Sequence, residues 1–341
     1  MDTMANPRKI ARTKPAGIEA GAPLSVIDGP VEALALIAPE LIEAEGHLHQ
    51  LLISDVQQVS SVATYLASAG GKRLRPALTA LAAKTLEYEG PISRLMCVGE
   101  LIHLGSLLHD DVVDDGRMRR GRPAAHLVHG NAVAILSGDF CLARAVLLAS
   151  EEGGHRAVHE LGQVVTEMAE GEVLQLVHTG NLDIAHSSYL DVISRKSAAL
   201  IAWCAAAPAY AANNDEWAQA LTVFGRAAGI AFQITDDILD YLPNTGKEPG
   251  ADLREKKPTL PLLYALEDVP DLKDELTQQQ STDEAITRWV QRIVQSTALE
   301  RARADAIELV DQATKALSVL PDNDARSALT HLARYLVQRL N

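Results

Sequence analysis

The chain has 341 residues, 47% of them hydrophobic, which is enough to bury a substantial core. Its formal net charge of -14 at pH 7 argues against a general affinity for nucleic acid or an anionic membrane, because both would repel an acidic surface. A site for phosphate-bearing ligands must therefore be a local concentration of cations.

The N-terminal stretch, residues 1–30, mixes charged residues with proline and glycine and lacks the apolar segment of a signal peptide. This composition predicts a flexible arm. A basic targeting peptide is the alternative, which the acidic residues Asp2, Glu19 and Asp28 disfavour.

From Val31 onward, apolar residues recur at spacings of three and four, and the period-two alternation of strands is missing. The pattern predicts an all-α protein of about ten to twelve helices, with residues 31–341 as a single domain. Turn-forming residues divide the pattern at Gly70-Gly71, Gly90-Pro91, Gly116 to Pro123, Gly153-Gly154, Gly180-Asn181, Asn213-Asn214, Pro243 to Pro261 and Pro270.

The longest apolar run, Ala198 to Ala212, is shorter than the roughly 20 residues of a membrane-spanning helix, and it contains Pro208. We therefore expect a core helix and no transmembrane segment. The three cysteines, Cys97, Cys141 and Cys204, lie in apolar stretches without metal-binding spacing, which indicates reduced thiols and a cytoplasmic location.

Cations gather at two places in the first half of this acidic chain. The segment GGKRLRP puts Lys72, Arg73 and Arg75 after a glycine pair, and RMRRG puts Arg119 and Arg120 shortly after an aspartate cluster. Arginine binds phosphate oxygens through its planar fork and lysine as a point charge, so the mixture suits two diphosphate groups. Surface salt bridges are the alternative.

Two aspartate clusters share the spacing DDxxD. Their members are Asp110, Asp111 and Asp114 in the first half, and Asp236, Asp237 and Asp240 in the second. On a helix, the first and last carboxylates of each cluster share a face, where they repel each other unless cations lie between them. Oxygen ligands beside a diphosphate suit Mg²⁺, so the clusters predict a magnesium site. A solvated acidic face is the alternative, which two copies bordering apolar helix make less expected.

Further candidates lie at helical spacing from these clusters. His103 is two turns before the first cluster, and Gln233 is one turn before the second, each on the shared face. A buried histidine and a surface amide are the respective alternatives. Lys247, Lys256 and Lys257 follow the second cluster in a Pro- and Gly-rich stretch, which predicts a mobile lid over phosphates or an ordinary solvated loop.

Together these motifs resemble the trans-isoprenyl diphosphate synthases, and among them the long-chain octaprenyl, solanesyl and decaprenyl synthases. The similarity runs from about Gly70 to Leu263 and includes, in order, GGKRLRP, DDxxD with RMRRG, GEVLQL, RKSAAL, FQITDDILDY and KPTLPL. It implies a single large helical bundle of the isoprenoid synthase type around a deep central cavity. It also implies Mg²⁺-dependent, head-to-tail condensation of isopentenyl diphosphate onto an allylic diphosphate.

The resemblance assigns roles to individual residues. The six aspartates are expected to bind about three Mg²⁺ ions. The side chains expected on isopentenyl diphosphate are Lys72, Arg75, His103 and Arg120. Those expected on the allylic diphosphate are Arg119, Lys196, Lys247 and Lys257. Those expected to stabilise the carbocation are Lys196, Ser197 and Gln233, with Ser197 in place of the family's more usual threonine.

The helix before the first aspartate cluster bears on product length. Counting back from the cluster, the side where an apolar tail would run presents Ser106, Gly105, Ile102 and Gly99. Three of these are small, where short-chain relatives typically place an aromatic ring. We therefore expect a deep channel and a product of roughly forty to fifty carbons. Close helix packing is the alternative reason for small residues there.

Other functions remain open at this point. A geranylgeranyl-type synthase would make a shorter product from the same motifs. A class I terpene cyclase would carry Asn and Ser ligands in its second metal motif and lack GKRLRP, and a non-catalytic synthase subunit would be expected to lose one cluster. The resemblance further implies a homodimer, a quinone side chain as the product's destination, and a transient membrane contact for product release.

Overall fold

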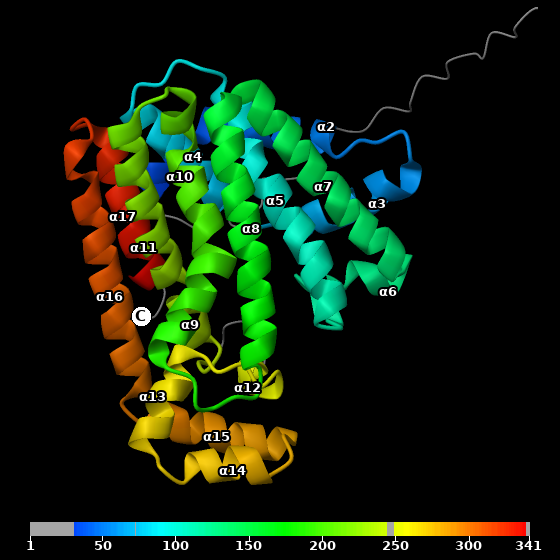
Figure 1. Ribbon diagram of the computed structural model, residues 1–341, viewed down its shortest axis with the longest axis vertical. Helices are drawn as coiled ribbons and strands as arrows, with labels where there is room; N and C mark the ends of the chain where they lie inside the picture. The colour runs from blue at the N-terminus through cyan, green and yellow to red at the C-terminus, as the bar shows by residue number, and fades with distance from the viewer. Residues whose placement is uncertain (1–30, 72, 244–248, 339–341) are drawn as a thin grey trace, which may run out of the picture.

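The computed structural model describes residues 31–71, 73–243 and 249–338. The predicted N-terminal arm and two predicted substrate ligands, Lys72 and Lys247, lie outside the described residues. Within the described part the chain is almost entirely helical (Figure 1), which confirms the all-α prediction. A two-stranded antiparallel hairpin was not expected.

The elements follow the predicted breaks closely. In chain order they are α1 (Val31–Ala35), α2 (Ala38–Leu51), α3 (Gln57–Ala67), α4 (Leu74–Thr85), α5 (Ile92–Val113), β1 (Met118–Arg119), β2 (Arg122–Pro123), α6 (Ala125–His129), α7 (Asn131–Glu152), α8 (Gly154–His178), α9 (His186–Ile193), η1 (Ser194–Ala198), α10 (Ala199–Ala211), α11 (Asp215–Leu239), α12 (Ala251–Arg254), α13 (Leu260–Asp268), α14 (Leu272–Gln278), α15 (Asp283–Gln295), α16 (Ala298–Ala316), η2 (Leu317–Val319) and α17 (Asp324–Gln338). The described residues form more helices than the ten to twelve that were expected, because short helices such as α6 and α12 were not predicted.

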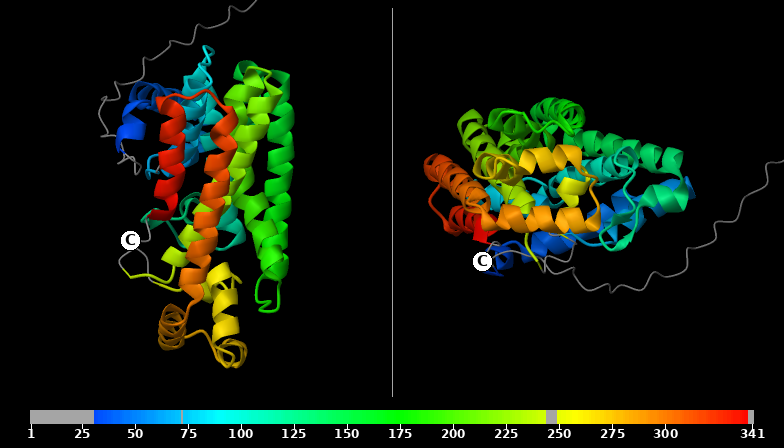
Figure 2. Two further views of the ribbon diagram at one scale, coloured as in Figure 1. Left: turned by 90° about the vertical axis from the view of Figure 1, so that its left-hand side faces the viewer. Right: turned by 90° about the horizontal axis from the view of Figure 1, so that it is seen from below.

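The centre of the bundle is α10, which packs against α4, α8 and α11 (Figures 1 and 2). Nearly all of its residues are buried, as expected of a helix that is apolar on every side. Its Trp203 donates from Nε1 to the backbone oxygen of Ala157 in α8, at 3.0 Å. The segment predicted as a core helix is therefore confirmed as one.

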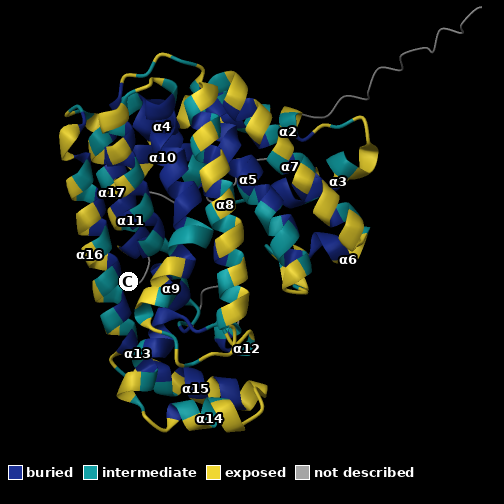
Figure 3. Ribbon diagram, viewed as in Figure 1, coloured by how far each residue is buried: buried dark blue, intermediate teal, exposed yellow. Residues whose placement is uncertain are grey.

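The outer helices bury one face each and expose the other (Figure 3). On one side of α11 lie α16 and α17, and on the far side of the bundle α7 packs against α5. The π-helical segment η1 joins α9 to α10. Such π segments often mark functional positions, because they rotate side chains out of the regular helical register.

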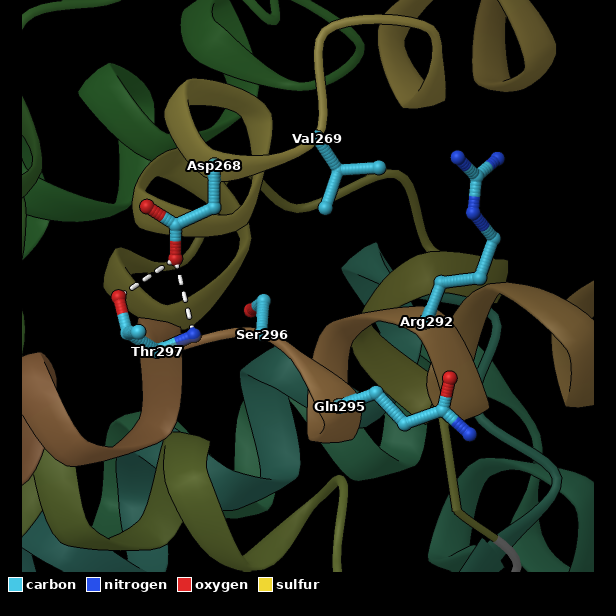
Figure 4. A pocket seen from close by; sticks show the side chains of 6 residues that line it. All are labelled: Asp268, Val269, Arg292, Gln295, Ser296 and Thr297. Atoms are coloured by element: carbon cyan, nitrogen blue, oxygen red, sulfur yellow. Dashed lines mark hydrogen bonds between the residues drawn. The ribbon is translucent and has the colours of Figure 1, made fainter.

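At one end of the molecule, α13 to α15 enclose a smaller buried cluster around Trp289 (Figure 1). A surface hollow of about 510 Å³ lies beside it, lined by the six residues labelled in Figure 4. There Asp268 accepts hydrogen bonds from the Thr297 backbone N–H (3.0 Å) and hydroxyl (2.7 Å), at the start of α16. The polar groups of this hollow thus connect the end of α13 to the start of α16.

Candidate functional site

A larger cavity of about 950 Å³ lies among α5, α8, α10 and α11, beside the loop that precedes α4. Residues from both aspartate clusters and from both predicted cationic segments line this cavity. Among them are Arg75, His103, Asp110, Arg119, Arg120, Lys196, Ser197, Gln233 and Asp236. Apolar lining residues include Ile102, Leu142, Val165, Met168, Leu200, Ile201 and Phe232. The fold therefore brings together candidates that are more than 100 positions apart in the sequence.

The first aspartate cluster occupies the C-terminal end of α5. Burial raises the pKa of Asp110 to about 6, against the lowering effect of Lys196. Asp111 is buried, and its Oδ1 accepts from Nε (2.7 Å) and Nη2 (2.6 Å) of Arg119, while its buried Oδ2 has no partner among the described residues. Asp114 lies 3.7 Å from the Lys257 ammonium group. The cluster is thus crowded, partly buried and close to cations.

The three aspartates of the second cluster lie in different surroundings on and after α11. Asp236 lines the cavity from α11. Asp237 is buried, which raises its pKa, and both of its oxygens accept hydrogen bonds from neighbouring side chains. Asp240 accepts from the backbone N–H groups of Ala251 (3.2 Å) and Asp252 (3.0 Å) and so fixes the start of α12. All three therefore stay candidate metal ligands: Asp236 lines the cavity, and Asp237 and Asp240 are oriented by their hydrogen bonds to the protein.

These carboxylates fit a hard divalent cation held together with a ligand. In the described ranges, no three Asp, Glu, His or Cys side chains converge closely enough to enclose a metal by themselves. Oxygen donors on opposite elements, α5 and α11, leave coordination positions for phosphate oxygens and water, as Mg²⁺ and Ca²⁺ require. The orphaned Asp111 Oδ2 also indicates a missing partner.

A chain of hydrogen bonds orients the predicted catalytic amide. The Ser197 hydroxyl donates to Gln233 Oε1 (2.9 Å), and Gln233 Nε2 donates to Asp237 Oδ1 (2.8 Å). The Tyr189 hydroxyl donates to Asp237 Oδ2 (2.7 Å). This network fixes which end of the Gln233 amide faces Ser197. Sequence reasoning missed Tyr189, which no motif marks.

The remaining predicted catalytic residue, Lys196, extends from the π-helical segment. Its Nζ lies 2.5 Å from Oε2 of Glu172 on α8, and both residues line the cavity. Glu172 falls in the GEVLQL motif, but its spacing alone gave it no role. Lys257 pairs with Glu255 (2.5 Å) as well as reaching toward the first cluster. Two cations expected on the allylic diphosphate are therefore held by carboxylates.

Three residues expected on isopentenyl diphosphate, two of them arginines, form the cationic wall of the cavity. Arg75, His103 and Arg120 all line it. Burial, and then the positive charges of Arg75 and Arg120, lower the pKa of His103 well below its usual value, so this side chain is neutral. The buried Nε of Arg75 has no partner among the described residues, and Arg120 donates from Nη1 to the Gly70 carbonyl. An anion with several oxygens, such as a diphosphate, would accept hydrogen bonds from the donors of this wall.

Only two of the four residues expected to set chain length line the cavity. Ile102 and Ser106 line the cavity, but Gly99 and Gly105 do not, so their predicted place on the channel wall is wrong. A Cβ added at Gly105 would lie 3.0 Å from a backbone oxygen of α7, and one at Gly99 would collide with Cys204 of α10. Both glycines allow close helix packing. The wall is completed by Leu142 and Met168, which the sequence did not reveal.

The sequence matches one family model and several known proteins. The family model described as Polyprenyl synthetase matches residues 56–295. The octaprenyl diphosphate synthase of Escherichia coli is 37% identical over 315 residues, covering 89% of this chain and 97% of the relative. An all-trans-nonaprenyl-diphosphate synthase (geranyl-diphosphate specific) of Rhodobacter capsulatus is 34% identical, covering 92% and 99%.

Solved structures show the same arrangement of helices. The polyprenyl synthase from Caulobacter crescentus, complexed with calcium and isoprenyl diphosphate, superposes with a TM-score of 0.86. Its sequence is 36% identical, and the match covers 92% of this chain and 98% of that one.

Proposed function

Because this chain belongs to the polyprenyl synthetase family and is a trans-prenyltransferase, we propose that it adds isopentenyl diphosphate repeatedly to a geranyl- or farnesyl-type diphosphate, giving an all-trans product of roughly forty to fifty carbons. The observation that carries the proposal is the cavity itself. Carboxylates on α5 and α11 share it with a cationic wall and with a long apolar lining.

The proposed cofactor is Mg²⁺, about three ions in each site. We assign six aspartates to hold it: Asp110 and Asp236, which line the cavity, with Asp111 and Asp114 beside the first and Asp237 and Asp240 beside the second. When bound, Mg²⁺ neutralises the allylic diphosphate and favours ionisation of its C–O bond. The calcium and isoprenyl diphosphate in the Caulobacter crescentus relative support this assignment.

The chain's own residues orient the two substrates. Arg75, neutral His103 and Arg120 bind isopentenyl diphosphate, and Arg119, Lys196 and Lys257 bind the allylic diphosphate. The Gln233 amide, held by its hydrogen bonds, presents its oxygen with the Ser197 hydroxyl beside the developing cation. The isopentenyl double bond attacks the allylic carbon, and the departing diphosphate takes the proton released from the adduct.

The two neighbouring arginines should have separable effects. Arg120→Ala should raise mainly the KM for isopentenyl diphosphate, because Arg120 belongs to the cationic wall and lies beside the Gly70–Gly71 loop. Arg119→Ala should raise mainly the KM for the allylic substrate, because Arg119 binds the first aspartate cluster. Steady-state kinetics with each substrate varied in turn would test this, and an Arg120→Ala change confined to the allylic KM would contradict the assignment.

The activity itself can be tested with isopentenyl diphosphate, farnesyl diphosphate and Mg²⁺. We expect pyrophosphate release and a linear product of long chain length on chromatography of the extracted prenols. Pyrophosphate from the allylic substrate alone would indicate a terpene cyclase. A twenty-carbon product would indicate a geranylgeranyl-type synthase, and no turnover would indicate a non-catalytic subunit.

A homodimer is also proposed, through the exposed apolar side of α6 and α7. Exposed side chains there are Leu127, Val128, Ile135, Leu136, Val146 and Leu147. Among the described residues, α7 is the one helix long and apolar enough to cross a membrane, with 39% of its most apolar window buried. Its packing against α5 and its exposed apolar face suit a helical interface.

A charge on this face should separate the dimer. Leu136 is 63% exposed and Leu147 is 50% exposed, three helical turns apart on one side of α7. Leu136→Asp combined with Leu147→Asp should shift the mass in light scattering from two chains to one, because buried unpaired carboxylates are costly. Thr166→Asp, on an exposed polar side of α8, is the control. A monomeric wild-type chain would contradict the proposal, and recruitment of that chain to lipid vesicles would favour the membrane contact.

The remaining assignments complete the proposal. We place residues 31–341 in one prenyltransferase domain, supported by the family match and by relatives that align along most of the chain. We also propose a cytoplasmic enzyme whose product supplies a quinone side chain.

A further inference from the structure

One cation of the GGKRLRP loop lies on the cavity but is bound by carboxylates. Arg73 is 7% exposed. Its Nε and Nη2 donate to Glu45 of α2 at 2.9 and 2.7 Å, and its Nη1 donates to Glu100 of α5 at 3.0 Å. Such charge-assisted, forked contacts hold a guanidinium in one orientation. Arg73 is therefore a structural cation within a loop of expected ligands.

The backbone at Arg73 explains why it has to be held. Its φ of 49° and ψ of 32° lie in the left-handed region, which residues with a Cβ rarely adopt, and it precedes the first residue of α4. Arg75 follows two residues later, in the first turn of that helix. The direction in which α4 begins, and with it the place of the Arg75 side chain, thus depends on the conformation at Arg73.

Glu100 connects this anchor to the cationic wall. It is 3% exposed and lies three residues before His103, so both extend from nearly the same side of α5. Its charge also acts on Arg120: burial lowers the pKa of that guanidinium below its usual value, and Glu100 partly offsets this lowering. Glu45, by contrast, is one-third exposed and binds Arg73 from the opposite side. Neither carboxylate belongs to a motif that sequence reasoning singled out.

We propose that Glu100, acting through Arg73, is a positioning residue that sets the α4 end of the isopentenyl diphosphate site. This inference rests on the proposed function. The buried pair of Arg73 and Glu100 fixes the left-handed turn, and the turn places Arg75 opposite His103 and Arg120. Glu100 lines the same cavity, but its negative charge would repel a diphosphate, so its role is to hold Arg73 and not to bind the substrate.

Two physical effects of Glu100 predict opposite results, which makes the proposal testable. If Glu100 acted only through its charge, Glu100→Gln would remove an anion near the diphosphate and lower the KM for isopentenyl diphosphate. If it acts by position, the same change releases Arg73 and displaces Arg75. We expect the KM for isopentenyl diphosphate to rise about tenfold or more, since small displacements of a binding group have large effects. The allylic KM should change less than about twofold.

Glu45→Gln is the matched control, because it removes a carboxylate from the same guanidinium at a position that water can reach. Its effect on the KM for isopentenyl diphosphate should be several times smaller. The double variant Arg73→Gln with Glu100→Gln leaves no buried unpaired charge, so its unfolding midpoint in urea should return toward that of the wild type. Its KM for isopentenyl diphosphate should nevertheless stay raised.

Three outcomes would overturn the proposal: a lower KM in Glu100→Gln, an equal change for both substrates, or a double variant with wild-type KM. If Glu100→Gln does not fold, the double variant decides alone. Calorimetric titration of isopentenyl diphosphate into each variant measures the same difference without turnover. A wild-type protein that binds this ligand but makes no product would contradict the proposed function and leave this test valid.

Discussion

Asp110→Asn and Asp236→Asn should each lower kcat by about a thousandfold or more, while the fold is retained. Each substitution keeps the shape of the side chain but removes a charged oxygen ligand from a cavity wall. The loss of transition-state stabilisation should be several kcal/mol, and each ~1.4 kcal/mol is tenfold in rate. Pyrophosphate release at ordinary Mg²⁺ concentration measures the effect, and circular dichroism checks the fold.

The matched control for this prediction is Asp115→Asn. Asp115 is adjacent to the first cluster, but its side chain is 97% exposed. Its φ of 49° is one that asparagine tolerates. Activity should therefore stay within about twofold of wild type. Near-normal turnover of Asp110→Asn, or an equal loss in Asp115→Asn, would show that the clusters do not bind the metal as proposed.

Ser106→Phe should shorten the product to roughly fifteen to twenty carbons while the first condensation continues at a near-normal rate. Ser106 lines the cavity one helical turn before Asp110, and its hydroxyl donates to the His103 backbone oxygen at 3.0 Å. A phenyl ring there would occupy space that a growing apolar tail needs. Because packed protein interiors deform little, products longer than the remaining channel should be almost absent. Chromatography of the prenols after phosphatase treatment measures the distribution.

Ser106→Ala separates ring volume from loss of the hydroxyl and should leave the product length unchanged. Gly105→Phe does not test chain length, although the sequence predicts Gly105 on the channel wall, because Gly105 does not line the cavity. A side chain there meets Leu142 and the backbone oxygen of Gly138 in α7, so it should destabilise the α5–α7 packing. An unchanged distribution in Ser106→Phe would show that the tail leaves the site by another route, for example past Met168 or Phe232.

Much of the site could be predicted because its chemistry depends on local spacing. The DDxxD clusters and the GGKRLRP segment combine residue types that suit hard cations and phosphates, and the fold does bring Asp110, Asp236 and Arg75 to one cavity. The helical period placed His103 and Gln233 on the correct faces, because a helix fixes direction from spacing alone.

The missed residues are those whose roles arise between elements. Tyr189, Glu172 and Glu100 bind side chains 48, 24 and 27 positions away. Only Glu172 falls in a recognised motif, GEVLQL, and local spacing predicts none of these contacts. Gly99 and Gly105 were placed on the channel because the helix face was judged by residue size. The packing of the bundle decides whether α7, α10 or the cavity lies against that face of α5.

By itself, the sequence therefore determined the all-helical class and the positions of the aspartate clusters and the cationic segments, since each follows from spacing along one helix or loop. The tertiary structure decided which carboxylates line the cavity, which cations are already paired, and which small residues face the channel. The physical reason is that pairing, burial and free volume depend on contacts between helices far apart in the chain, and local periodicity does not encode those contacts.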